Sequence, residues 1–171
     1  MTKSRAGLTE LEGAILGVLV RAPSATAYRV RRVFQESRSA EWSGSAGAVY
    51  PAIRRLVTDR LIKERAEADA RGTHTYDLTR AGKDAYERWL CDVTRAVGPG
   101  VDPFRTRAPL WAGLSPATQR KLAKDLKAEL DEQREALTRT LNKLDAGDEI
   151  TARLHIALLD LRLKWIDDQA R

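Results

Sequence analysis

The sequence has few of the residues on which cross-links, metal sites and membrane spans depend. A single cysteine, Cys91, excludes an intramolecular disulfide and suits a reducing compartment. Two histidines, His74 and His155, are too few for a multi-histidine zinc cluster. The longest apolar run, residues 13–20, is too short to cross a bilayer, and no signal peptide precedes it. We therefore expect a soluble cytoplasmic protein without a metal.

Motifs that mark common catalytic sites are missing as well. There is no Gly-x-Ser-x-Gly elbow, no phosphate-binding loop and no dinucleotide-binding fingerprint. The carboxylates are scattered over segments with helical periodicity, as is typical of solvated charges. We therefore expect no enzymatic activity, no catalytic residue and no cofactor.

Positive charge is in excess and unevenly distributed. The net charge is +6, and residues 1–100 carry 17 Lys and Arg against 12 Asp and Glu, whereas residues 101–171 carry 13 against 12. A basic surface binds phosphates because each neutralised phosphate releases condensed counterions. A solvated surface with a chance surplus of arginine has the same composition, so the charge alone leaves nucleic-acid binding open.

Residues 42–56 place two different faces on one short helix. Four apolar residues recur at three- and four-residue spacing and predict a buried face: Ala46, Val49, Ile53 and Leu56. The other face carries Ser45, Tyr50 and Arg54, which is typical of a helix that recognises DNA. Ser43 or Ser45 can cap the start of this helix. Pro51 predicts a bend before the helix continues to residue 59.

The flanking segments predict a winged helix-turn-helix. Thr9 and Glu12 form a capping box for a helix over residues 10–21, and a second helix is expected over residues 26–36. Residues 61–65 and 73–78 read as a β-hairpin, the wing. Thr79 then caps a helix that runs to about residue 96 and is expected to bury its apolar positions: Ala81, Ala85, Trp89 and Leu90.

The C-terminal part predicts two long helices. Gly98-Pro99-Gly100 marks a boundary, and Ser115-Pro116 is a strong helix start. Two narrow apolar stripes follow: Leu122, Leu126, Leu130, Leu137, Leu141 and Leu144, then Ile150, Leu154, Leu158, Leu161 and Trp165. Such helices need another surface to bury both stripes, either in a second subunit or in a hairpin folded back on the chain. We expect a DNA-binding domain over residues 1–97, a linker over 98–114 and a helical dimerisation domain over 115–171.

Several strings in the first half resemble the PadR family of bacterial transcriptional regulators. These are GAVYPAIRRL preceded by WS, the hairpin ending YDLTRAGKDAYERWL, the opening LTELEGAILGVLV, and Ala27-Tyr28-Arg29-Val30. The resemblance covers about residues 8 to 90. It implies a mainly α fold with a small β-hairpin, in which a winged helix-turn-helix is followed by a helical C-terminal dimerisation arm.

The pattern and the resemblance together name candidate DNA-binding residues: Tyr28, Arg29, Ser43, Ser45, Tyr50, Arg54, Arg55, Arg71, Thr73 and His74. Tyr28 and Tyr50 have an alternative role in packing, Arg55 in a surface ion pair, and His74 as a solvated side chain. Some PadR-like repressors bind flat aromatic or hydrophobic compounds at the dimer seam. Trp111 and Trp165 are therefore candidate effector-binding residues, with plain interface packing as the alternative.

The expected function is sequence-specific binding to double-stranded DNA by a homodimer that regulates transcription. A ligand-responsive repressor on an inverted-repeat operator fits best, with half-sites about one helical turn, or a multiple of it, apart. The competing hypothesis is a module for protein–protein interaction, without DNA, built on the same winged helix and helical arm.

Overall fold

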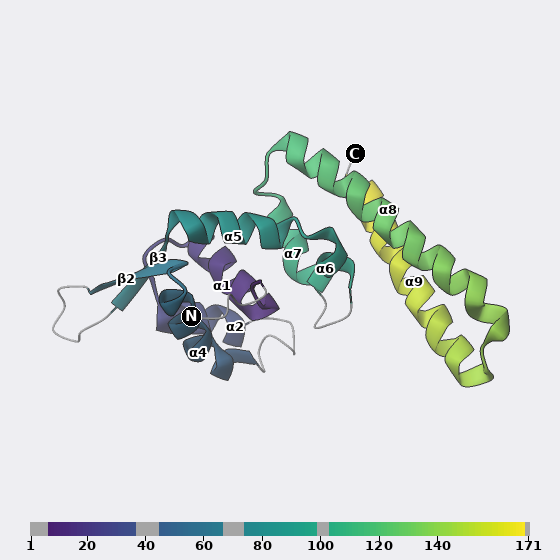
Figure 1. Ribbon diagram of the computed structural model, residues 1–171, viewed down its shortest axis with the longest axis horizontal. Helices are drawn as coiled ribbons and strands as arrows, with labels where there is room; N and C mark the ends of the chain where they lie inside the picture. Colours follow the sequence, from purple (N-terminus) through teal and green to yellow (C-terminus); the bar gives the residue numbers. More distant parts are fainter. Residues whose placement is uncertain (1–6, 37–44, 67–73, 99–102, 170–171) are drawn as a thin grey trace, which may run out of the picture. The chain divides into compact units, whose positions relative to one another are not determined.

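The computed structural model describes residues 7–36, 45–66, 74–98 and 103–169 (Figure 1). The chain forms two compact units. The first unit is Met1–Asp92 with Gly100–Leu110, and the second unit is Val93–Pro99 with Trp111–Arg171. No helix in the described ranges combines the length and the apolarity that crossing a bilayer requires.

The first unit is a winged helix-turn-helix, as the sequence predicts (Figure 1). Its elements are α1 (Glu10–Arg21), β1 (Ala25–Thr26), α2 (Ala27–Gln35), the 3₁₀ turn η1 (Ser45–Ala48), α4 (Val49–Thr58), β2 (Ile62–Ala66), β3 (His74–Leu78), α5 (Arg80–Leu90) and α7 (Pro103–Trp111). The three strands form an antiparallel sheet in the order β1-β3-β2. The expected hairpin is therefore extended by one short strand.

Helix α1 begins at the capping box that the sequence predicts. The Thr9 hydroxyl accepts the Glu12 N–H, and the Glu12 carboxylate accepts the Thr9 N–H. Gly13 lies against the indole of Trp89, and a Cβ at this position would be 2.2 Å from Trp89 Cε2. A glycine is therefore required where α1 and α5 approach each other.

Helix α4 starts differently from the expected bent helix. The turn η1 ends at Ala48 and the α-helix begins at Val49, so Pro51 falls in its first turn. A proline costs little there because the first N–H groups of a helix have no intrahelical acceptor. Three of the predicted apolar residues, Val49, Ile53 and Leu56, are buried. The side chain of Ala46 lies outside the described residues.

The end of α4 sets the start of the wing. The Leu61 N–H donates to the Leu56 carbonyl and the Arg60 N–H to the Val57 carbonyl, which is a Schellman ending. Arg60 has φ 56°, the left-handed conformation that glycine usually supplies at this position. The turn leads into β2, and Ile62 is buried beneath the sheet.

Helix α5 is shorter than expected, and it buries two of the four predicted apolar residues, Trp89 and Leu90. It ends at Leu90 rather than near residue 96. Ala81, expected in the core, is exposed, and its neighbour Gly82 is buried instead. A Cβ at Gly82 would lie 1.9 Å from the Leu61 carbonyl oxygen, so the close approach of the wing sets the phase of the helix.

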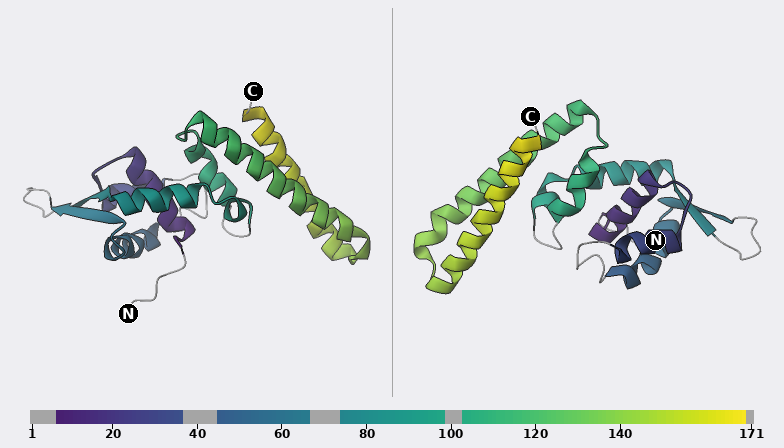
Figure 2. Two further views of the ribbon diagram at one scale, coloured as in Figure 1. Left: turned by 45° about the horizontal axis from the view of Figure 1, so that its top comes forward. Right: turned by 180° about the vertical axis from the view of Figure 1, so that it is seen from behind.

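The second unit contains a helical hairpin. Its elements are α6 (Val93–Val97), α8 (Pro116–Thr140), the 3₁₀ turn η2 (Leu141–Lys143) and α9 (Ala146–Gln169). Ser115 caps α8 as predicted, because its hydroxyl accepts the Thr118 N–H at 3.2 Å. Helices α8 and α9 run antiparallel, side by side, in every view (Figures 1 and 2). The expected linker of residues 98–114 contains α7, whose residues up to Leu110 cluster with the first unit.

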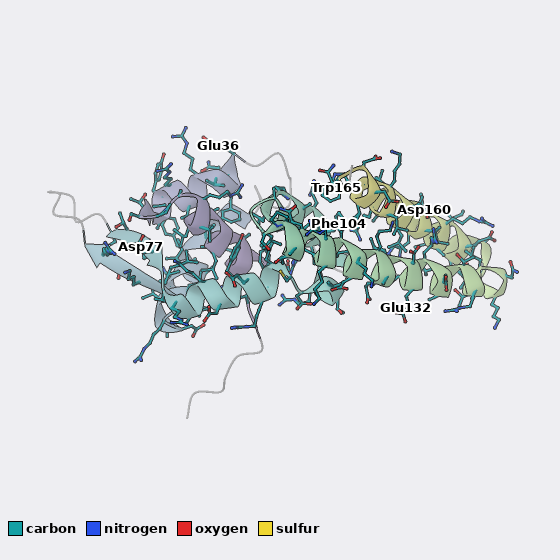
Figure 3. All side chains as sticks on the ribbon, turned by 90° about the horizontal axis from the view of Figure 1, so that it is seen from above. Glu36, Asp77, Phe104, Glu132, Asp160 and Trp165 are labelled. Atoms are coloured by element: carbon teal, nitrogen blue, oxygen red, sulfur yellow. The ribbon has the colours of Figure 1, made fainter. Side chains whose placement is uncertain are left out.

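The two long helices pack through apolar side chains and are joined by ion pairs. The buried residues are Leu122, Leu126 and Leu130 of α8 and Ala152, Leu159, Arg162, Leu163 and Ile166 of α9. Arg134 and Asp160 form one ion pair between the helices at 3.3 Å, and Lys127 and Asp167 form another. Figure 3 labels Asp160 on α9 and Glu132 on α8.

The predicted apolar stripe of α9 does not face α8. Its five residues are exposed: Ile150, Leu154, Leu158, Leu161 and Trp165. At about 100° of rotation per residue they span roughly 80° of the helix surface, on the side away from Leu159 and Leu163. The hairpin therefore buries one face of α9 and leaves a second apolar face uncovered within the described chain.

Candidate nucleic-acid interface

The exposed face of α4 presents a phenol and a guanidinium next to each other. Tyr50 is 39% exposed and Arg54 is exposed one turn later, about 40° around the helix axis. None of the described residues pairs with the Arg54 guanidinium. A free guanidinium can bond both acceptors of a guanine edge or two phosphate oxygens. The core on the opposite side, with Val49 and Ile53, fixes the helix that carries these groups.

Helix α2 packs against α4 and η1 and presents a second tyrosine–arginine pair. Val30 and Phe34 face the core, whereas Tyr28 is 62% exposed and Arg29 is exposed. The hydroxyl of Thr26 accepts the Arg29 N–H at 3.1 Å and caps the helix. Tyr28 is therefore a surface residue rather than a packing residue between helices.

Arg55, the third predicted residue on α4, forms an ion pair. Its Nε donates to Glu12 Oε1 at 2.9 Å. The partner lies on α1, 43 residues away in the sequence. The predicted alternative of an ion pair is therefore confirmed, although the carboxylate involved is buried.

The base of the wing is held by polar contacts between its strands. Glu64 on β2 accepts the Tyr76 hydroxyl at 3.0 Å and lies 3.3 Å from His74 Nδ1. Burial, together with the Glu64 carboxylate, raises the pKa of Tyr76 to about 12, so the phenol stays a hydrogen-bond donor at neutral pH. His74 is exposed at the start of β3, where a groove or a phosphate can be reached.

Asp77 connects the wing to the turn before β1 (Figure 3). Its carboxylate accepts the Ser24 N–H at 2.9 Å and the Ser24 hydroxyl at 3.0 Å. It also pairs with Arg65 of β2 at 3.1 Å. These bonds fix β3 between its two neighbouring strands, and with it the position of His74.

Four predicted DNA-binding side chains lie outside the described residues. Ser43, Arg71 and Thr73 belong to undescribed segments. Ser45 begins η1, but its side chain is not described. The described part of the predicted interface is therefore formed by Tyr28, Arg29, Tyr50, Arg54, Arg55 and His74.

The structure brings the two candidate effector-binding residues together in the second unit. The rings of Trp111 and Trp165 have centroids 6.2 Å apart and planes inclined by 49°. Trp111 is buried and Trp165, labelled in Figure 3, is partly exposed on the uncovered face of α9. The distance between the centroids is in the range over which aromatic rings interact.

A buried charged cluster behind the interface was not predicted. Arg107 of α7 is fully buried and donates to the carbonyls of Trp89 and Pro103, each at 3.1 Å. Both of its Nη groups also donate to the Glu10 carboxylate, and its guanidinium carbon lies 4.3 Å from the Trp89 ring centroid. The cluster joins α1, α5 and α7. Glu10 and Arg107 are 97 residues apart, so no local sequence pattern indicates the pair.

A family model and several solved structures are similar to the chain. The model of the transcriptional regulator PadR-like family matches residues 15–88. No curated protein matches the chain. Bacillus subtilis PadR in complex with operator DNA is 21% identical, with a TM-score of 0.46 and coverage of 95% of this chain and 97% of that one.

Two further solved structures are similar to the chain. Bacillus subtilis PadR in complex with p-coumaric acid is 22% identical, with a TM-score of 0.42 and coverage of 94% and 96%. The PadR-like regulator BC1756 from Bacillus cereus is 16% identical, with a TM-score of 0.45 and coverage of 99% and 97%. PadR-family regulators are DNA-binding proteins and not enzymes. The match over residues 15–88 spans the helix-turn-helix and the wing, so this segment of the chain is similar to the PadR-like family of transcriptional regulators.

Proposed function

We propose that the protein is a cytoplasmic homodimeric repressor that binds an inverted repeat in double-stranded DNA. One observation carries the proposal. Within the segment that matches the family, α4 exposes Tyr50 beside an Arg54 guanidinium that no described residue pairs with. A helix that buries one face and exposes Tyr50 and Arg54 on the other fits the major groove, where base edges carry a distinct pattern of donors and acceptors.

The candidate residues divide into those that read bases and those that hold the backbone. Arg54 is proposed to bond a guanine edge, with Tyr50 beside it. Phosphate contacts are proposed for the remaining residues: Tyr28, Arg29, Ser43, Ser45 and Arg55 around the helices, and Arg71, Thr73 and His74 on the wing. Backbone contacts fix the register of the helix in the groove, and the bonds of Arg54 select the sequence.

Arg54→Ala tests this assignment. With a duplex selected from a random pool by the unmodified protein, we expect the substitution to cost about 1–3 kcal/mol of binding free energy per half-site. The measurement is a fluorescence-anisotropy titration, repeated with an unrelated duplex of the same length. Arg54 is exposed and pairs with none of the described residues, so the fold is expected to persist.

Arg153→Ala on α9 is the matched control, because it removes an exposed arginine from the second unit. We expect this variant to keep the preference for the selected duplex over the unrelated one. An equal loss of affinity for both duplexes in Arg54→Ala would show that Arg54 does not contact the bases. Failure of the unmodified protein to select any duplex would favour the protein–protein interaction module instead.

The uncovered face of α9 is proposed as the dimer interface. Leu154 is 69% exposed and Leu161 is 63% exposed, and both lie on the same stripe as Trp165. Soluble monomers rarely expose a contiguous apolar stripe of this length. A second copy of the same helix, related by two-fold symmetry, covers such a stripe with an identical one. Two winged helices then face an inverted repeat, and occupancy of the operator blocks RNA polymerase.

A flat aromatic effector is proposed to bind at the Trp111 and Trp165 rings. Trp165 belongs both to this pair and to the stripe of α9, so a ligand stacked on it lies at the proposed dimer seam. Such a ligand alters DNA binding only if it binds one arrangement of the dimer more tightly than another.

Titration with a panel of aromatic carboxylic acids tests the effector site. We expect a binding compound to quench tryptophan fluorescence and to lower the affinity for the selected duplex, because ligand and DNA favour different arrangements. Trp165→Leu is expected to abolish both effects while preserving DNA binding without ligand. Quenching that persists in Trp165→Leu would place the ligand elsewhere. No quenching across the panel would support plain packing of the two rings.

A further inference from the structure

A single carboxylate connects the start of α1 to the recognition helix α4. Glu12 Oε2 accepts the Thr9 N–H and Oε1 accepts the Arg55 Nε–H, each at 2.9 Å. Both carboxylate oxygens thus have partners on two different elements. The Glu12 side chain is 3% exposed, so the core around it prevents it from turning away. Glu12 is therefore the fixed member of the pair.

Arg55 is the exposed member and still has hydrogen-bond donors to offer. Its side chain is 45% exposed, and only Nε is used for Glu12. Among the described residues, none accepts a hydrogen bond from its Nη groups. The guanidinium is planar, so fixing Nε also fixes the direction in which the Nη groups point. An arginine held in this way presents a preformed fork of the kind that binds phosphate.

The position of Arg55 on α4 suits a contact with the DNA backbone at the side of the groove rather than with the base edges. At about 100° per residue, Arg55 lies about 100° around the helix from Arg54 and about 140° from Tyr50. It therefore borders the buried side, whereas Arg54 lies in the middle of the exposed face. Side chains at the flank of a helix in the major groove meet the sugar-phosphate backbone.

We infer that Glu12 is a positioning residue, which holds the Arg55 guanidinium with its Nη groups toward a DNA phosphate beside the groove that α4 enters. The inference rests on the proposed function and deepens it. Glu12 offsets part of the positive charge of Arg55, so the pair adds direction as well as attraction. The register of the recognition helix on its operator, and hence specificity, depends on this contact.

Salt titrations of four proteins test the inference: the unmodified protein, Glu12→Gln, Arg55→Gln and the double variant. The probes are the duplex selected by the unmodified protein and an unrelated duplex of equal length. We expect Arg55→Gln to reduce the slope of log affinity against log salt by about 0.9 for each phosphate that is no longer neutralised, and thus by close to 2 for a dimer.

Glu12→Gln is expected to act on DNA binding through Arg55. Affinity for the selected duplex falls about tenfold, because the fork is no longer held by a charged hydrogen bond. Affinity for the unrelated duplex does not fall, because removal of the carboxylate adds a positive charge. In the Arg55→Gln background, Glu12→Gln has no further effect on operator affinity. A destabilising substitution would instead weaken binding to both duplexes.

Two further variants keep the test decisive. Glu149→Gln removes the carboxylate that bonds Arg153 on α9, with the same change in charge, and is expected to leave the preference unchanged. Arg55→Lys replaces Arg55→Gln if that variant does not fold. Lysine keeps the positive charge but lacks the two Nη groups, so we expect the salt slope to be retained and the preference for the selected duplex to decline.

An Arg55→Gln slope equal to that of the unmodified protein overturns the inference, and so does a Glu12→Gln loss that is equal on both duplexes. Both results leave the proposed function standing. An unmodified protein that selects no duplex contradicts the proposed function itself.

Discussion

Arg107→Ala is expected to lower the free energy of unfolding by about 3–5 kcal/mol, because it leaves the Glu10 carboxylate without its cation. Arg107 is fully buried and also donates to the carbonyls of Trp89 and Pro103. Both carbonyls lose this side-chain donor, and each lost hydrogen bond adds to the cost. Urea unfolding followed by circular dichroism measures the change, since small proteins unfold with a linear dependence on denaturant.

A matched substitution and a compensating one define what the Arg107 result means. Arg88→Ala removes an exposed arginine from α5 and is expected to change stability by less than about 0.5 kcal/mol. Replacing both charged partners, in Glu10→Leu with Arg107→Met, is expected to recover most of the loss, because no buried charge of this pair remains. A small effect of Arg107→Ala would show that α7 contributes little to the first unit.

Leu154→Glu with Leu161→Glu is expected to convert the proposed dimer to a monomer and to weaken binding to the selected duplex by about 10²- to 10⁴-fold. The two substitutions place charges in the centre of the proposed interface, where burial would leave them unpaired. A monomer binds each half-site independently and loses the high effective concentration that links the two binding events. Sedimentation velocity measures the oligomeric state, and fluorescence anisotropy measures the affinity.

The same helix supplies a control for charge. Arg153→Gln with Lys164→Gln changes the net charge by the same amount at exposed positions beside the stripe. This variant is expected to remain dimeric. Both leucines are exposed in the single chain, so the helical hairpin is expected to keep its circular dichroism spectrum after substitution. A double glutamate variant that stays dimeric would show that α9 does not form the interface.

Helix starts could be predicted from the sequence because capping is a local interaction. The Thr9 and Glu12 capping box and the Ser115-Pro116 start each lie within four residues, and both begin helices where predicted. The two faces of α4 could be predicted for the same reason, since spacing along one helix determines which residues share a side. Tyr50 and Arg54 are exposed, and Ile53 and Leu56 are buried.

Contacts between distant segments could not be predicted. The partners of Arg55 and Arg107 are 43 and 97 residues away, and no spacing rule relates a charge on one helix to a carboxylate on another. Trp89 and Leu90 of α5 are buried as predicted, but Ala81 is exposed because Gly82 lies against Leu61 instead, an approach that only the folded wing determines. Strand β1 has two residues, too few to produce an alternating pattern.

The paired carboxylates at the start of α1 have a consequence for how the molecule responds to ligands. Glu10 attaches α1 to α7, and Glu12, two residues further along the same helix, attaches it to α4. Sliding or rolling of α1 would break both attachments at once, so the first unit resists internal deformation. We therefore propose that the helices and the wing of the first unit would respond to the proposed effector together, as one body.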